Sequence, residues 1–172
     1  MIFLDLINWQ KVRKAVIYLI CIVLAAWLQT MVFSRFRILG AAPFFLPALA
    51  VAIGLWEGGV WGAALGMAAG FYCDLCFTDT TVLFFVLFTV YGFTAGLLAE
   101  FLINRRFVSY LLLAAAALVI TALVQALPLW IFRGAAPGPL FTVALLQALW
   151  SLPLAALLYP VIKAVAGKQR RA

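Results

Sequence analysis

The chain has 172 residues, of which 69% are hydrophobic and only 10% are charged, and its formal net charge is +7. Soluble domains are about 45–50% apolar and about 25% charged, and no water-soluble core of this size could bury so many apolar side chains. The composition therefore excludes a separate soluble domain. It indicates one integral membrane domain over residues 1–172.

Apolar runs recur along the chain, most of them near the roughly 20 residues that cross a hydrocarbon core. The first run follows a basic cluster and has no clear small-residue cleavage site, so we expect a retained membrane helix and not a cleaved signal. The second run is short, and it is either a thin, tilted span or a re-entrant segment; we expect a span. The predicted fold is an all-α bundle of six membrane helices over residues 15–165, at 15–33, 43–56, 59–77, 82–103, 109–132 and 140–165.

The segment before the first span, residues 1–14, has the pattern of a short helix lying in the membrane interface. Its apolar residues share one helical face, and Asp5 and Asn8 lie on the other. The apolar residues of that face are Ile2, Phe3, Leu6 and Trp9. We expect this segment on the cytoplasmic side.

The distribution of basic residues predicts the orientation. With six spans and a cytoplasmic N-terminus, the inner side carries nine basic residues, namely Lys11, Arg13, Lys14, Arg105, Arg106, Lys163, Lys168, Arg170 and Arg171. The outer side carries only Arg35, Arg37 and Arg133. Lys and Arg concentrate in cytoplasmic loops, so both termini are predicted inside, with a basic tail over 166–172. Anionic headgroups account for this charge without any nucleic acid.

Glycines recur every four residues from Gly54 to Gly70, and the same spacing continues to Asp74. Glycine costs a helix roughly 1 kcal/mol relative to alanine, so the ladder indicates a place where another backbone comes very close, as in membrane helix pairs. The fourth predicted span carries its own pair, Gly92 and Gly96, followed at the same spacing by Glu100.

Depths along the two spans, at about 1.5 Å per residue, predict antiparallel packing of glycine against glycine. Gly66 would then lie level with Gly96, and Gly70 level with Gly92. A four-residue step overshoots one turn by about 40°, so the stripe faces a second neighbour as well. We therefore expect a partner membrane helix to dock on the residues Gly62, Gly66, Gly70 and Asp74, whereas Gly54 and Gly58 belong to an inner turn around Glu57.

Five polar side chains inside the predicted spans need an explanation, because polar groups in lipid mark partners or pathways. They are Gln29, Asp74, Glu100, Gln125 and Gln147. For the glutamines we expect interhelical hydrogen bonds, worth about 0.6 to 2 kcal/mol each. A substrate pathway would require these groups to converge.

The chain has no histidine and three cysteines, which limits its chemistry. Cys73 and Cys76 form a C-x-x-C pair, but ligands for zinc are too few. We expect Cys21, Cys73 and Cys76 to be small apolar residues, and a bond within the C-x-x-C pair stays open. Histidine-dependent intramembrane catalysis is excluded on residue type. Asp74 and Asp79 lie at a span end and its loop, where a carboxylate acts as an anchor or cap. We expect no enzyme, cofactor or metal.

Residues 66–75 resemble the G-x-x-x-G-x-x-x-D-L signature of the MreD family of rod shape-determining proteins, with Gly66, Gly70, Asp74 and Leu75 in the fixed positions. Leu28 and Gln29 resemble the leucine-glutamine pair of that family, and residues 40–43 resemble the turn before its second span. Phe44 stands where the family often has a polar residue, and the glycine that usually starts the fourth span is missing.

The resemblance implies a non-enzymatic scaffold of the bacterial elongation machinery in the cytoplasmic membrane. Such proteins act with MreC and help to couple MreB filaments to the peptidoglycan synthases. The basic patch of Arg105, Arg106, Lys168, Arg170 and Arg171 would face MreB or anionic lipid. The implied fold is similar to the substrate-binding subunits of energy-coupling-factor vitamin transporters. That similarity leaves a vitamin-binding subunit as the alternative, for which the short outer loops offer few polar groups.

Overall fold

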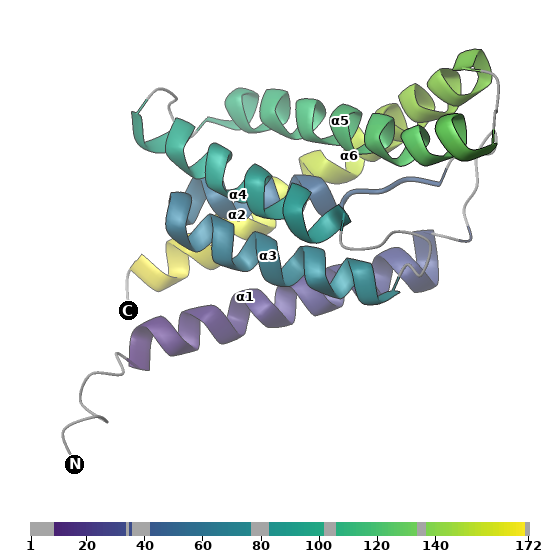
Figure 1. The fold of residues 1–172 in the computed structure, drawn as a ribbon. Coiled ribbons are helices and arrows are strands. Elements are labelled where there is room, and N and C mark those ends of the chain that lie inside the picture. The colour runs from purple at the N-terminus through teal and green to yellow at the C-terminus, as the bar shows by residue number, and fades with distance from the viewer. Residues whose placement is uncertain are drawn as a thin grey trace.

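The computed structural model describes residues 9–33, 35, 42–76, 83–101, 106–133 and 137–170. These residues form six helices and no strand (Figure 1). The helices are α1 (Trp9–Leu28), α2 (Leu46–Glu57), α3 (Gly59–Cys76), α4 (Leu83–Phe101), α5 (Phe107–Arg133) and α6 (Pro137–Arg170), and α1 continues as a π-helical turn over Gln29–Phe33. The predicted interfacial helix falls mostly on residues 1–8, outside the described part of the chain.

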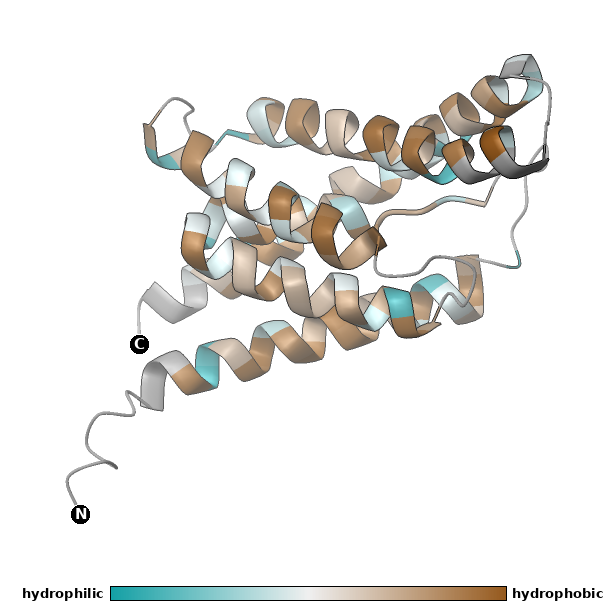
Figure 2. Cartoon of the chain, in the orientation of Figure 1, coloured by the Kyte–Doolittle hydropathy of each residue, from teal (hydrophilic) through white to brown (hydrophobic). Residues whose placement is uncertain are grey.

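Four of these helices are long and apolar enough to cross a membrane, over Val12–Phe33, Leu83–Phe101, Phe107–Leu127 and Gly138–Gly167. Hydrophobic residues run along every helix in Figure 2, with hydrophilic positions few and scattered. The prediction of an all-helical, multi-pass membrane protein is therefore confirmed. Six full crossings stay a prediction.

The helices run side by side, and successive helices alternate in direction (Figure 1). The start of α1 and the end of α6 lie at the same end of the molecule, which we call the basal end; the opposite end is the distal end. The α2–α3 junction also lies at the basal end, and the start of α4 lies at the distal end.

The short helix α2 is the centre of the molecule. Every residue from Leu46 to Leu55 is buried, and α2 contacts α3, α4, α5 and α6. A helix that is apolar on all sides belongs in the interior of a bundle, and this sequence has no polar residue before Glu57.

The second predicted span is only partly helical, which corrects the expectation for residues 43–56. Residues 42–45 are non-helical and largely buried. Helix α2 begins at Leu46, and Pro47 lies in its first turn. Proline disfavours a helical conformation in the preceding residue but fits a first turn, where its missing N–H is not needed. Twelve helical residues rise about 18 Å, and of the non-helical residues before them Phe45 is not extended, with φ −97° and ψ −5°. The helical part of this segment alone is therefore shorter than the roughly 30 Å of a hydrocarbon core.

Candidate functional site

The glycine stripe of α3 lies against the backbone of α4. Gly62, Gly66 and Gly70 are all buried. A Cβ atom added to any of them would overlap a backbone carbonyl of α4, at Gly92, Phe88 and Phe84 respectively. Because a carbonyl in a helix cannot rotate away, these positions admit no side chain. Close approach of two helix backbones, predicted from the glycine spacing, is therefore what the structure shows.

The register of the pair differs from the one that we predicted. Gly92 faces Gly62, and Gly96 lies against Gly58 and Gly59. Residue 92 thus meets α3 eight positions earlier than expected, about 12 Å along the helix. The prediction took the depth of each glycine from the expected positions of the loops. In the structure, contacts at the two ends of the helix pair set the register.

Helix α2 joins the same contact. A Cβ at Gly54 would overlap the backbone of Gly92, and a Cβ at Gly62 would come within 2.6 Å of the Gly54 Cα atom. Gly54, Gly62 and Gly92 therefore form a junction of three helix backbones. This corrects the assignment of Gly54 to a basal turn; only Gly58 belongs to that turn.

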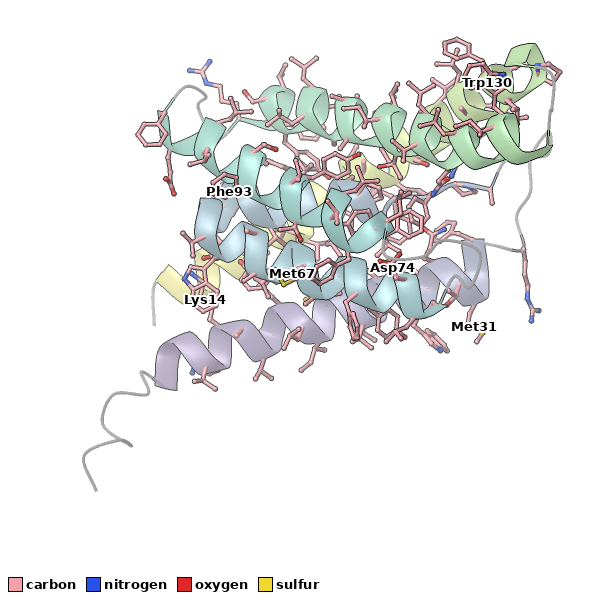
Figure 3. The ribbon with its side chains drawn as sticks, viewed as in Figure 1. Lys14, Met31, Met67, Asp74, Phe93 and Trp130 are labelled. Atoms are coloured by element: carbon pink, nitrogen blue, oxygen red, sulfur yellow. The ribbon has the colours of Figure 1, made fainter. Side chains whose placement is uncertain are left out.

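Asp74 caps the first turn of α4. Its Oδ1 accepts a hydrogen bond from the Phe84 N–H at 3.1 Å, and its Oδ2 accepts one from the Phe85 N–H at 2.9 Å. The first N–H groups of a helix have no partner within the helix, and the helix dipole favours a negative charge beside them. Figure 3 shows Asp74 on α3 beside the start of α4.

Glu100 makes the equivalent contact at the basal end. Its Oε1 accepts a hydrogen bond from the N–H of Gly59, the first residue of α3, at 3.4 Å. The preceding residue, Gly58, has φ 92° and ψ 173°, a combination that is essentially restricted to glycine. Each of the two helices thus ends in a carboxylate that caps the start of the other.

This arrangement corrects the predicted docking of a partner helix on Gly62, Gly66, Gly70 and Asp74. The three glycines are covered by α4, and the Asp74 carboxylate bonds to α4. Another protein could reach this stripe only by displacing α4. The prediction that Gly92 and Gly96 pack internally agrees with their contacts to α3.

Gln29 holds the non-helical segment before α2. Its Nε2 donates to the Pro43 carbonyl at 2.6 Å, and its Oε1 accepts from the Phe45 N–H at 3.2 Å. The Phe44 N–H donates to the Ser151 Oγ at 2.7 Å. Non-helical backbone at membrane depth is tolerated where protein groups satisfy it. Here the side chains of Gln29 and Ser151 satisfy the backbone groups of this segment.

The remaining two glutamines continue this polar region into α5 and α6. The Ser151 Oγ donates to the Gln147 carbonyl at 2.6 Å, and the Gln147 Nε2 donates to the Gln125 Oε1 at 3.3 Å. The predicted interhelical hydrogen bond is confirmed for Gln125 and Gln147. Sequence reasoning missed Ser151, because a serine inside an apolar helix is usually bonded to its own backbone.

A charged cluster at the basal end was also missed. The Lys14 ammonium forms an ion pair with the Glu57 Oε2 atom, and the Tyr18 O–H donates to the Glu57 Oε1 at 2.6 Å. The Glu57 side chain is only 5% exposed. In the sequence, Lys14 and Tyr18 lie one turn apart, but Tyr18 and Glu57 are separated by 39 positions, so the contact cannot be predicted locally.

The other predicted residues have no shared site in the described part of the chain. Cys73 is buried, Cys76 is exposed and Cys21 is half-buried, and all three thiols are free. Arg106 is exposed just before α5. Arg105 and Arg171 lie outside the described residues, and Lys168 and Arg170 are described only as part of the α6 backbone.

Comparisons with known proteins add no family to this description. The chain matches no protein-family model, no curated protein and no solved structure.

Proposed function

We propose that this chain is a non-enzymatic membrane scaffold of the bacterial cell-elongation machinery, in the manner of the MreD proteins that its motifs resemble. It would lie in the cytoplasmic membrane with six spans and with its basal end inside. There it would bind the membrane helix of MreC and help to couple MreB filaments, directly or indirectly, to the elongation peptidoglycan synthases. Its basic basal end would meet MreB or anionic lipid.

The observation that carries this proposal is that the separate motifs of the resemblance are joined in space. Gln29 of the leucine-glutamine pair donates to the carbonyl of Pro43, which ends the turn motif. Gly66, Gly70 and Asp74 of the third-span signature all contact α4. Each motif thus has a physical task in one architecture, which favours a shared fold over chance matches in an apolar sequence.

The chemistry of the interior favours a scaffold over the vitamin-binding alternative. An open groove of about 460 Å³ lies between α5 and the start of α6, and several of its lining residues are exposed. It is lined by Ile120, Leu123, Val124, Ala126, Leu127, Trp130, Leu140 and Phe141. None of these side chains except the Trp130 indole carries a polar group. A vitamin site needs several convergent polar groups, whereas Gln29, Gln125, Gln147 and Ser151 are engaged in helix contacts.

The partner helix needs a surface other than the glycine stripe, and α3 offers one beside Asp74. Its lipid-facing edge exposes Val60, Met67, Phe71 and Leu75. These residues recur at helical spacing along the whole length of α3 and leave the contact with α4 untouched. We assign the MreC helix to this edge.

Co-purification of MreC from membranes tests the assignment. The double variant Phe71→Ala, Leu75→Ala reshapes the edge without reaching α4, and it should retain several-fold less MreC than the unaltered chain. Leu112→Ala is the matched control, because Leu112 is an equally exposed apolar residue on α5, and it should retain MreC fully.

Two outcomes would contradict different parts of the proposal. Full retention of MreC by the double variant would reject the α3 edge but not the scaffold. Absence of MreC from the unaltered protein, together with a stoichiometric vitamin in its native mass spectrum, would reject the scaffold and favour the transporter subunit.

A further inference from the structure

Helix α1 packs along α3 and makes polar contacts to the α2 segment at its two ends. Its buried residues form one narrow stripe of Tyr18, Ile22, Ala26 and Gln29. Most of its other large apolar residues are exposed, including Leu24 and Trp27. In lipid, apolar contacts between helices replace equally apolar contacts with acyl chains, so burial alone holds α1 weakly.

The two polar residues of that stripe bind opposite ends of the α2 segment. At the distal end, Gln29 bonds to the backbone of Pro43 and Phe45. At the basal end, Tyr18 and Lys14 both bind the Glu57 carboxylate. We call these the distal clip and the basal clip. Between them, only Ile22 and the methyl group of Ala26 are buried on α1.

The two clips differ in their access to water and headgroups. Gln29 is 3% exposed and bonds to backbone atoms, so nothing outside the protein competes for it. The Lys14 side chain is 31% exposed and belongs to a basic stretch at the end of a membrane helix. Anionic headgroups attract such residues, and they therefore compete with Glu57 for Lys14.

We propose that α1 is a strap that opens at its basal end when an anionic membrane surface draws Lys14 away from Glu57. Removal of Lys14 leaves a buried carboxylate without its counter-ion, which is strongly unfavourable. The carboxylate regains water only if the first turns of α1 move away from α2 and α3. The distal clip stays closed, so α1 pivots about Gln29 and uncovers the basal part of α3.

Spin-label distances in lipid nanodiscs test this strap. In a chain with its three native cysteines replaced by alanine, one label pair at Val16 and Val60 reports the basal end. A second pair at Met31 and Leu75 reports the distal end. All four positions are exposed. Phosphatidylcholine discs should give one basal distance, and discs rich in phosphatidylglycerol should add a longer one, with the distal distance unchanged in both.

Variants separate the clip from general loosening. Lys14→Gln should give the longer basal distance in both lipids, and Glu57→Gln should abolish the dependence on phosphatidylglycerol. Tyr18→Phe removes one hydroxyl and should raise the open fraction less than Lys14→Gln. Glu100→Gln is the matched control, because this carboxylate lies at the same end but bonds to α3. It should leave the lipid dependence unchanged.

The strap is rejected if the basal distance is the same in both lipids or if Lys14→Gln leaves it unchanged. It is also rejected if the basal and distal distances lengthen together, because that result describes a helix that detaches as a whole.

Discussion

The α3–α4 pair and the α5–α6 pair are both antiparallel and apolar, yet they are held together in different ways. In α3–α4, backbone lies on backbone along the glycine stripe, and a carboxylate caps each end. In α5–α6, the Gln147 Nε2 donates to the Gln125 Oε1, the Tyr110 O–H donates to the Ala155 carbonyl, and an open groove of about 460 Å³ lies near the distal end. The first pair has a single permitted register. The second has room to adapt.

The largest expected effect comes from a bulky residue in the stripe. Gly70→Leu would place a side chain where it overlaps the Phe84 carbonyl oxygen and the Phe85 Cα atom. Because these are backbone atoms, the loss of folding free energy should exceed the usual cost of overpacking, about 1–3 kcal/mol. Denaturant unfolding in mixed micelles should show that loss, or the protein should fail to accumulate. Gly167→Leu, at a position with nothing within 4 Å of an added Cβ, should be tolerated. A stable Gly70→Leu variant would disprove the backbone contact.

Loss of the distal cap should cost less. Asp74→Ala leaves the N–H groups of Phe84 and Phe85 without their acceptor, and comparable caps contribute about 0.5–2 kcal/mol. Asp74→Asn keeps one acceptor oxygen and should lose roughly half as much. The same unfolding measurement ranks the three proteins. Equal stability of Asp74→Ala and the unaltered chain would show that the cap contributes nothing.

Removal of the glutamine hydrogen bond between α5 and α6 should have a smaller effect. Gln125→Leu deletes the acceptor of the Gln147 amide, and hydrogen bonds between membrane helices average about 0.6 kcal/mol. Thermal unfolding should shift only slightly, whereas Thr94→Val, which removes a bond within α4 alone, serves as the reference. A loss as large as that of Asp74→Ala would mean that the two pairs are held equally firmly.

The smallest effect is expected at the open groove between α5 and α6. Leu123→Trp adds volume beside an open space, so the unfolding midpoint should stay within the error of the unaltered chain. The outcome is the reverse of Gly70→Leu, although both changes enlarge a residue in a helix pair. A large destabilisation by Leu123→Trp would show that α5–α6 is as tightly specified as α3–α4.

The sequence predicted what composition and periodicity control. Apolar runs located the helices to within a few residues for most of the chain, and glycine spacing identified the close contact of α3 and α4. Register was not predictable in this way, because it depends on Glu100 reaching Gly59 and on Asp74 reaching Phe84. Pro47 indicates that α2 begins at about residue 46 and not at residue 43. The prediction followed the apolar run, which begins earlier.

The candidate site was harder to predict, because its residues meet only through the fold. Lys14 was counted as one of several basic residues, and nothing local connects it to Glu57. Nothing in the sequence indicates the role of Ser151, because the Phe44 N–H that it binds lies 107 positions away. Polar residues in an apolar chain are easy to identify. Their partners depend on which helices become neighbours.

The reciprocal caps also bear on the bilayer around the protein. The first residue of α3 and Asp74 are 15 residues apart, a rise of about 22 Å, whereas a hydrocarbon core is about 30 Å thick. A bilayer that keeps both carboxylates near its polar boundaries must thin beside α3 and α4. On the opposite side, α6 has 34 residues and imposes no such thinning. The protein would therefore be encircled by a membrane of uneven thickness, and neighbouring proteins with short hydrophobic spans would gather preferentially on the α3–α4 side.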